Sequence, residues 1–511
     1  MRAFFVDYLC KKFTLNLYMK TFLSLIFNVF VACFGFAQEA KVITYPVPET
    51  EKANCHYAVF VNGKPVDIYK AQSPVHSMYE GAEYYFCYFD FEGEVDVRVH
   101  SKNSFCRPCP YTITDPKVRA QYAKTNVSEV YPRYIKVYRY NSHNVYFKRT
   151  KPFQAIIMRD GIKMPLIVFG NPIEKNPPKK DDPNVVYFGA GLHYVKEPII
   201  LKDNQTLYVA GGAVLRSTME NLGVAFGAKD AKNVSIRGSG IISFDNRARF
   251  RNNGIVFRNC QNAKIEGVII RDCNNWTVDF RNCNKVLVEN LKICGSRMIN
   301  DDAIDICNSQ NVVIKNTFCR VQDDAIAIKG VPEVEPSKPV ENVLIENCIF
   351  WVDSANVFRV GYDCFAPYFK NIKCKNIYVP FYAKYQKPTE YWTHSIFLFQ
   401  PTNDITIENF EVDGLHIRSN GDDMSLLVAK THPVHNSSKC GNMKNCKIKN
   451  VHITGKKGKF RGEVFIEGKD ENYKITDVSV ENVYYFGKKK TFPDKDVHIG
   501  PYTENIKIFK K

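Results

Sequence analysis

The feature that most constrains the fold of this chain is a short hydrophobic pattern that recurs from about residue 232 onward. Each copy alternates apolar and polar residues and then reaches an Asn or Gly, as in NVSIRG (233–238) and VSVENV (478–483). One apolar column runs through Ile265, Val288, Ile314, Ile345 and Cys374. Its steps are 23, 26, 31 and 29 residues, and repeats of this length indicate a solenoid. Because Val and Ile alternate with polar residues between turn signals, the walls should be strands.

A coil of three short strands needs about 22–25 residues, since strands average about 5–6 residues each. The sequence therefore predicts an all-β chain whose main body, residues 183–511, is a right-handed parallel β-helix. Later steps of the repeat grow to 33, 41 and 32 residues. These steps predict longer loops in the C-terminal coils.

Residues 40–170 lack the repeat and form a second predicted domain. Segments such as 82–100 and 133–149 alternate apolar and polar residues between turn signals. This alternation predicts an antiparallel β-sandwich ahead of the solenoid. A polar, proline-rich stretch at 171–182 is the expected connection between the two.

The N-terminus is typical of an export signal. From Met19 the chain has a lysine, an apolar run and then small residues before a polar stretch, which is the order of a secretory signal peptide. We expect residues 1–37 to be a leader, with Met19 as the true start and cleavage after Ala37. Lipid attachment at Cys33 is the alternative. The apolar run is short for a membrane span, so we predict a secreted or periplasmic protein with no stable membrane insertion.

The formal net charge is +17, and the basic residues are spread along the chain without a long cluster. A solvated surface is the simplest interpretation of this charge, and an acidic partner is the sharper one. Nucleic acid would suit a basic protein in principle, but an export signal favours a polysaccharide instead. The positive net charge suggests that this polysaccharide is anionic. We therefore predict a polysaccharide substrate, no nucleic-acid partner and a monomer.

Of the 17 cysteines, two fall in the leader, which leaves an odd number that cannot all pair within the chain. Six of the others fall near the solenoid repeat, as Cys260, Cys283 and Cys307, and as Cys273, Cys294 and Cys319. Free cysteine packs as a small apolar residue. We therefore predict buried thiol columns rather than disulfides or a metal site.

Two acidic motifs lie about one coil apart. MINDDAIDI (298–306) is nearly repeated by VQDDAIAI (321–328). Neighbouring strands lie about 4.7–4.9 Å apart, so Asp301 should lie beside Asp323, and Asp302 beside Asp324. Extending the alignment predicts a column of Asn253, Trp276, Asp302, Asp324 and Asn356.

Like charges stacked at this spacing repel one another, so at least one carboxyl should have a raised pKa. Acid/base catalysis requires such asymmetry, with one protonated carboxyl and one ionised carboxylate. Asp in a turn also often accepts backbone N–H bonds, and a calcium site is a further alternative. Simple alternation would point Asp302 into the core with Ile304 and Ile306. Catalysis therefore requires that Asp302 lie in the turn before the strand.

The two motifs resemble those of the polygalacturonases, glycoside hydrolase family 28. NDDA (300–303) stands where that family has Asn-Thr-Asp-Gly, and QDDA (322–325) stands where it has Gly/Gln-Asp-Asp. The resemblance implies a β-helical hydrolase that inverts the anomeric centre without a metal or other cofactor. It implies that Asp323 is the general acid, while Asp302 and Asp324 position and deprotonate water.

Two further motifs of that family have no match, since FRVGYD (358–363) stands near the expected Gly-His-Gly and no Arg-x-Lys was found. The sandwich and the QDDAIAI segment are similar instead to the dextranase and isopullulanase relatives of family 49. The residues we expect to line the cleft are Trp276, Asp301, Lys329, Arg359, Tyr362, Asp363, Lys384 and His394. Taken singly, each also fits a place on the surface or in the core.

The sequence thus predicts a secreted inverting glycoside hydrolase that acts on a pectin-like or other plant or algal glycan. A polysaccharide lyase and a non-catalytic carbohydrate-binding solenoid are the alternatives. A lyase usually needs a calcium cluster and a base, whereas a binding protein has no need of tandem acids.

Overall fold

The computed structural model describes residues 40–72, 84–102, 129–141, 143–158, 165–219, 223–244, 253–295, 300–382, 394–421, 424–433, 439–457, 463–491 and 496–509. Within these ranges the chain forms strands and one short 3-10 helix, η1 (Glu49–Glu51), without any α-helix. None of the described segments is a helix long and apolar enough to span a membrane. The predicted leader, with Met19 and Cys33, lies outside the described residues, as does Lys384.

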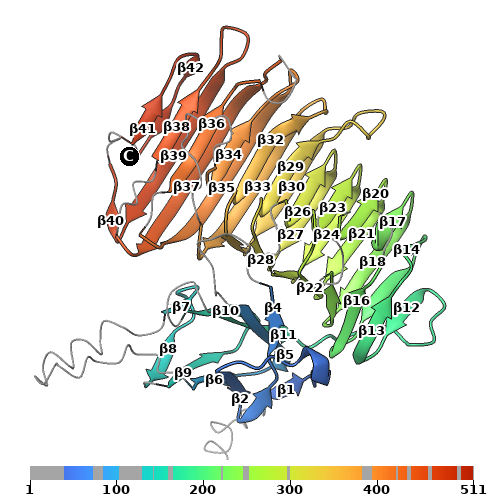
Figure 1. The fold of residues 1–511 in the computed structure, drawn as a ribbon. Helices are drawn as coiled ribbons and strands as arrows, with labels where there is room; N and C mark the ends of the chain where they lie inside the picture. The colour runs from blue at the N-terminus through green and yellow to red at the C-terminus, as the bar shows by residue number, and fades with distance from the viewer. Residues whose placement is uncertain are drawn as a thin grey trace, which may run out of the picture.

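The N-terminal part is a sandwich of two sheets (Figure 1). The six-stranded sheet contains β1 (Lys41–Thr44), β4 (Tyr69–Ala71), β5 (Tyr84–Glu92), β7 (Glu129–Tyr131), β10 (Phe153–Met158) and β11 (Leu166–Pro172). The five-stranded sheet contains β2 (Tyr57–Val61), β3 (Lys64–Val66), β6 (Val95–Ser101), β8 (Val137–Tyr140) and β9 (Asn144–Arg149). Neighbouring strands are antiparallel except β5 and β11, which are parallel. The alternating apolar residues of both sheets meet in one buried core.

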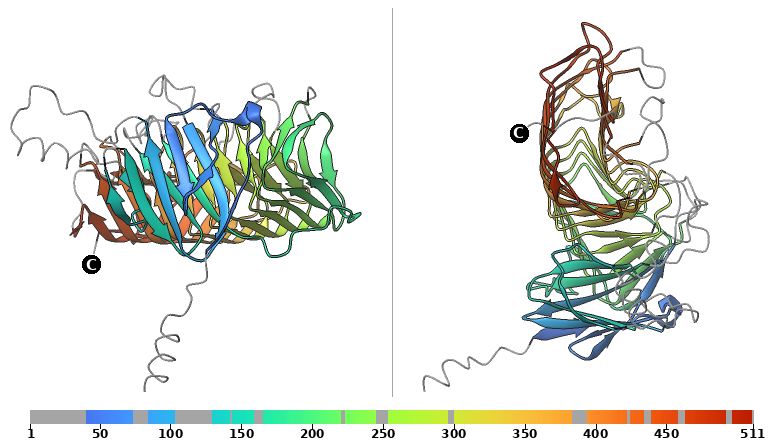
Figure 2. Two further views of the ribbon diagram at one scale, coloured as in Figure 1. Left: turned by 90° about the horizontal axis from the view of Figure 1, so that it is seen from below. Right: turned by 90° about the vertical axis from the view of Figure 1, so that its left-hand side faces the viewer.

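From β12 onward the strands form a parallel β-helix with two long sheets. The 11-stranded sheet contains β14 (Ile199–Leu201), β17 (Phe226–Lys229), β20 (Ile255–Arg258), β23 (Val278–Arg281), β26 (Ile304–Cys307), β29 (Ile326–Gly330), β32 (Phe358–Cys364), β34 (Phe397–Gln400), β36 (Ser425–Lys430), β38 (Glu463–Glu467) and β41 (Val497–Ile499). The right-hand view of Figure 2 shows the coils stacked behind one another. The predicted all-β fold, a β-helix preceded by a sandwich, is confirmed.

The 21-stranded sheet wraps around the rest of the solenoid. It contains β12 (Val185–Phe188), β13 (Gly191–Val195), β15 (Thr206–Val209), β16 (Ala213–Ser217), β18 (Lys232–Gly238), β19 (Ile241–Ser243), β21 (Gln261–Glu266), β22 (Ile269–Arg271), β24 (Asn284–Glu289), β25 (Lys292–Cys294), β27 (Gln310–Lys315), β28 (Phe318–Val321), β30 (Val340–Glu346), β31 (Ile349–Val352), β33 (Phe369–Val379), β35 (Thr406–Ser419), β37 (Asn442–Gly455), β39 (Ile475–Tyr485), β40 (Lys488–Lys489), β42 (Thr503–Glu504) and β43 (Lys507–Ile508).

The predicted apolar column holds along the solenoid. Ile265, Val288, Ile314, Ile345 and Cys374 are successive partners in the strand register. All five are buried in the core of the β-helix. An inward column of this kind sets the register, because a slip of one residue would turn its apolar side chains toward solvent.

Two details of the repeat differ from the prediction. In the C-terminal coils two strands merge into one, and β35 and β37 each extend over 14 residues. In earlier coils a corner separates two strands, and both β30 and β31 pair with the single strand β33. The corner is therefore straightened, but residues 340–352 of β30 and β31 already cover a similar length, so the strands do not account for the longer steps.

The register confirms Cys260 beside Cys283, but the other partners in the predicted cysteine columns were wrong. Ser309, and not Cys307, continues the column of Cys260 and Cys283, because Gln261, Asn284 and Gln310 are aligned. In the second set, Cys294 pairs with Arg271 and Cys319 with Ile293. The thirteen described cysteines are free thiols, and all except Cys55 are buried.

The sandwich packs directly on the β-helix. One buried cluster combines side chains of the six-stranded sheet, such as Phe86 and Phe169, with side chains of the solenoid, such as Phe318 and Trp351. Phe169 and Phe318 lie edge to face, with ring centroids 5.3 Å apart. The strands of the solenoid that contribute to this cluster include β25, β28 and β31, which lead into the turns that precede the 11-stranded sheet.

Candidate active site

The two acidic motifs lie in the turns that precede β26 and β29, in neighbouring coils. Ile304 pairs with Ile326, so Asp302 and Asp324, two residues earlier, lie side by side. The same register extends through β20, β23 and β32. It confirms the predicted column of Asn253, Trp276, Asp302, Asp324 and Asn356.

Asp302 avoids the core because it precedes the strand. Ile304 and Ile306 point into the solenoid, so Asp305 between them points outward. The carboxylates of Asp302 and Asp305 both contact Lys329 Nζ. Asp302 therefore lies on the outer face, as catalysis requires.

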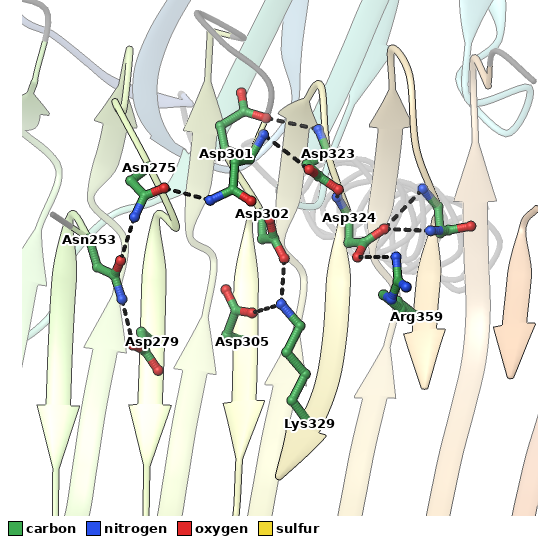
Figure 3. A network of polar contacts seen from close by, with 12 residues as sticks. Asn253, Asn275, Asp279, Asp301, Asp302, Asp305, Asp323, Asp324, Lys329 and Arg359 are labelled. Atoms are coloured by element: carbon green, nitrogen blue, oxygen red, sulfur yellow. Dashed lines mark hydrogen bonds and ion pairs between the residues drawn. The ribbon is translucent and has the colours of Figure 1, made fainter. Parts of the chain in front are cut away.

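Three carboxyl groups converge at this place (Figure 3). One oxygen from each of Asp302, Asp323 and Asp324 lies within 4.8 Å of the other two. Asp302 and Asp324 are each 2% exposed, whereas Asp323 is half-buried. Asp323 is therefore the carboxyl that an incoming molecule meets most easily.

The environments of Asp323 and Asp324 differ in a way that separates their protonation. Burial, reinforced by the carboxylates of Asp302 and Asp324, raises the pKa of Asp323 well above its ordinary value. Burial also raises the pKa of Asp324, but the Arg359 guanidinium acts against this shift. Two backbone N–H groups, from Asn300 and Asp324, donate to Asp323 and favour its ionised form. Burial and the two adjacent carboxylates outweigh these bonds, so the net shift of the Asp323 pKa is upward.

Asp301 has a different role from its neighbours. Its side chain is 2% exposed, and its Oδ1 accepts hydrogen bonds from the backbone N–H groups of Gln322 at 2.8 Å and Asp323 at 2.9 Å. Burial raises its pKa well above the ordinary value. These contacts argue against the substrate contact that we predicted for Asp301. They show instead a side chain that fixes the second acidic turn on the first coil.

Asp324 is held by the next coil. Its Oδ1 accepts bonds from the backbone N–H of Asn356 at 3.1 Å and from Asn356 Nδ2 at 2.7 Å. Its Oδ2 lies 3.9 Å from Nη1 of Arg359, whose Nη2 donates to Gln400 Oε1 at 2.7 Å. The Arg359 guanidinium also lies 4.2 Å from the ring centroid of Tyr362. Arg359 is thus occupied by groups of the protein.

The other predicted cleft residues lie at different distances from the cluster. Trp276 is half-buried, and its ring centroid lies 3.8 Å from Lys329 Nζ. His394, at the start of the next coil but one, has a pKa lowered to about 4 by burial and by Arg359. Asp363 lies at the end of β32 and is half-buried. Among the described residues, the structure therefore joins Lys329, Arg359 and Trp276 most directly to the aspartates.

A chain of amide side chains, which sequence reasoning missed, leads to Asp323 (Figure 3). Asn253 Nδ2 donates to Asp279 Oδ2 at 2.6 Å, and Asn275 Nδ2 donates to Asn253 Oδ1 at 2.9 Å. Asn300 Nδ2 donates to Asn275 Oδ1 at 2.6 Å, and the Asn300 backbone N–H donates to Asp323 Oδ2 at 3.0 Å. The signal available in the sequence was the repetition of Asn in the turns one coil apart.

The three carboxylates are close enough together to surround a cation. Carboxylate oxygens are suitable ligands for calcium, but an acidic cluster on its own does not identify a metal site. Two cations of the protein, Lys329 and Arg359, already lie beside the cluster. We therefore assign no metal to these residues, and the expectation of no cofactor stays a prediction.

Comparisons with known proteins match the segment that carries the two aspartate motifs. Residues 228–351 match the family described as glycosyl hydrolases family 28. A probable polygalacturonase from Arabidopsis thaliana is 27% identical over 149 residues, which is 24% of this chain. The matched segment spans about a third of that relative's length, 33%.

A solved structure shares this fold. Dex49A from Penicillium minioluteum superposes with a TM-score of 0.63 at 14% identity, over 91% of this chain and 96% of that one. A family 28 exopolygalacturonase from Yersinia enterocolitica gives a TM-score of 0.47 at 14% identity, over 93% and 97% of the two chains. At 14% identity, the similarity to Dex49A shows a shared fold alone. The predicted family resemblance is confirmed, since the segment that carries both aspartate motifs is similar to glycosyl hydrolases of family 28.

Proposed function

We propose that this protein is an exported glycoside hydrolase that cleaves a polysaccharide with inversion at the anomeric carbon. The observation that carries acid/base hydrolysis is the convergence of Asp302, Asp323 and Asp324, with one oxygen of each within 4.8 Å of the others. Inversion rests instead on the resemblance of the two aspartate motifs to family 28. The similarity of residues 228–351 to family 28 supports hydrolysis as the reaction. The similarity to a probable polygalacturonase supports a plant or algal glycan as the substrate.

Asp323 is the general acid in this proposal. It is the most exposed of the three carboxyls, and its surroundings keep it protonated. As the bond between the anomeric carbon and the glycosidic oxygen breaks, Asp323 gives its proton to that oxygen. The leaving sugar departs as a neutral alcohol.

Asp302 and Asp324 position the attacking water. The water oxygen forms a bond to the anomeric carbon from the face opposite the leaving group, and a carboxylate takes the water proton. Lys329 and Asn356 fix these two carboxylates through hydrogen bonds of 2.8 Å and 2.7 Å. Such preorganisation lowers the cost of arranging the groups during the reaction.

The first test incubates the purified protein with a panel of neutral and anionic plant and algal polysaccharides. New reducing ends without ultraviolet absorbance indicate hydrolysis, whereas an absorbing unsaturated product would indicate a lyase. Binding without any product would favour a carbohydrate-binding solenoid. Either of the last two results would reject the proposal.

The second test replaces the acid on the substrate that the panel identifies. Asp323→Asn keeps the shape of the side chain but removes the proton that it donates. General acid catalysis contributes about 10²–10⁴-fold, so kcat should fall by at least about 10²-fold. Asp413→Asn is a matched control, because Asp413 lies on β35 of the other sheet and pairs with Lys449. Turnover by D323N equal to that of D413N would reject Asp323 as the acid.

A further inference from the structure

A buried lysine lies beneath the carboxylate cluster. Lys329 is 4% exposed, and its Nζ lies 2.8 Å from Asp302 Oδ2 and 2.8 Å from Asp305 Oδ1. The same nitrogen lies 3.8 Å from the ring centroid of Trp276. An ammonium group has three N–H donors, and these three contacts surround it. The geometry thus leaves Lys329 little freedom to bind an anionic group of a substrate, although we predicted that it lines the cleft.

The two carboxyls that share Lys329 are not equivalent. Asp305 is fully buried, and burial raises its pKa well above the ordinary value even though Lys329 opposes the shift. Lys329 is therefore the one cation that Asp302 and Asp305 share, at 2.8 Å from an oxygen of each. The titratable and charged groups around this pair are Asp279, Arg281, Asp301, Cys307, Asp323, Asp324 and Arg359.

We propose that Lys329 is a positioning residue, whose ammonium compensates and orients the Asp302 carboxylate while the proton of the acid stays on Asp323. This inference rests on the proposed function, because its effect on catalysis exists only if the protein is a hydrolase. Without the ammonium, Asp302 would compete with Asp323 for that proton, because an opposite charge nearby is what favours the carboxylate. The protonation states of the base and the acid would then no longer be distinct.

The experiment compares Lys329→Met with the double variant Lys329→Met/Asp305→Asn. Lys329→Met removes the charge and keeps an unbranched side chain of similar length. The second substitution removes the carboxyl that would otherwise remain buried without its partner. Lys229→Met is the matched control, because Lys229 occupies the same strand position on β17 and is exposed. All variants are assayed on the polysaccharide that the panel identifies.

For K329M we expect kcat to fall at least about 10-fold with little change in KM. The acidic limb of the kcat/KM profile should move up by about 1–3 pH units, which is the usual effect of losing an opposite charge at this distance. The double variant should regain the melting temperature of the wild type but not its kcat or pH profile. If kcat and the pH profile recover together with the melting temperature, the role of Lys329 is structural only. A raised KM with an unshifted profile would return Lys329 to substrate binding.

A second readout needs no substrate and separates this inference from the proposed function. In K329M, two buried carboxyls lose their counterion, so their ionisation should cost more. The melting temperature of K329M, measured by circular dichroism, should therefore fall more steeply from pH 5 to pH 8 than that of K229M. If no glycan is cleaved but this difference is found, the proposed function fails and the contact of Lys329 with the aspartates stands. Identical pH dependence of the two variants would overturn the inference, whether or not the protein hydrolyses a glycan.

Discussion

Arg320 offers a direct test of how the sandwich supports the candidate active site. It lies on β28, just before the turn that carries Asp323, and is 1% exposed. Its Nε lies 3.1 Å from Asp353 Oδ2. Its guanidinium carbon lies 4.5 Å from the ring centroids of both Tyr84, in the sandwich, and Trp351, in the solenoid. Replacing Arg320 with Met removes these contacts but leaves an apolar side chain of similar length.

The expected cost follows from what the substitution leaves behind. Removing one partner of a buried ion pair destabilises a protein by about 3–5 kcal/mol, because the other charge stays buried. Each lost cation–π contact adds roughly 0.5–2 kcal/mol, although the terms overlap. We expect Arg320→Met to lower the free energy of unfolding by about 4 kcal/mol. Adding Asp353→Asn removes the isolated charge and keeps an acceptor for Trp351 Nε1, which donates to Asp353 at 2.7 Å. It should recover about 2 kcal/mol.

Urea denaturation followed by tryptophan fluorescence measures both values, because Trp351 is one of only three tryptophans. A fluorescence transition that moves to lower urea in R320M, and part of the way back in R320M/D353N, would support the reasoning. A single variant as stable as the wild type would refute it. A double variant less stable than the single one would show that Asp353 is not left as an uncompensated charge.

Two other predictions concern stereochemistry and pH. Proton NMR of the first product should show the inverted anomer. A retained anomer would reject inversion and would agree better with the carboxyl spacing. The oxygens lie within 4.8 Å, closer than the usual separation of about 6.5–9.5 Å between carboxyl groups in inverting enzymes. Burial and His452 lower the pKa of His416 to about 4 in the folded protein. In the unfolded chain the pKa of this histidine is near 6.5, so between about pH 4 and pH 6.5 the unfolded chain binds more protons than the folded one. The stability from His416 should therefore be complete above about pH 6.5 and lost as the pH falls toward 4, and His416→Asn should reduce that acid loss by on the order of 1–2 kcal/mol, measured by thermal unfolding at both pH values. An acid loss unchanged in H416N would contradict the assignment.

The register of the solenoid could be predicted from the sequence because burial imposes it. Columns such as Ile265 to Val288 must point inward, and the apolar repeat records that requirement. The cysteines carry less information, because a small side chain fits either face of a wall, and Cys307 lies two residues from its predicted column. A contact such as Lys329 with Asp305 depends on the reach of a long side chain across 24 positions of sequence. The periodicity of the strands therefore does not predict such a contact.

The charge balance of the cluster explains why three aspartates, and not two, suit this site. Asp302, Asp323 and Asp324 could together carry three negative charges, while Lys329 and Arg359 supply two positive ones beside them. Because the site is largely removed from water, an uncompensated third charge would be costly. The least costly state of the cluster therefore holds one proton, and that proton belongs on the carboxyl with no cation beside it. In the proposed reaction, the arrangement of the two cations would thus select Asp323 as the acid before any substrate arrives.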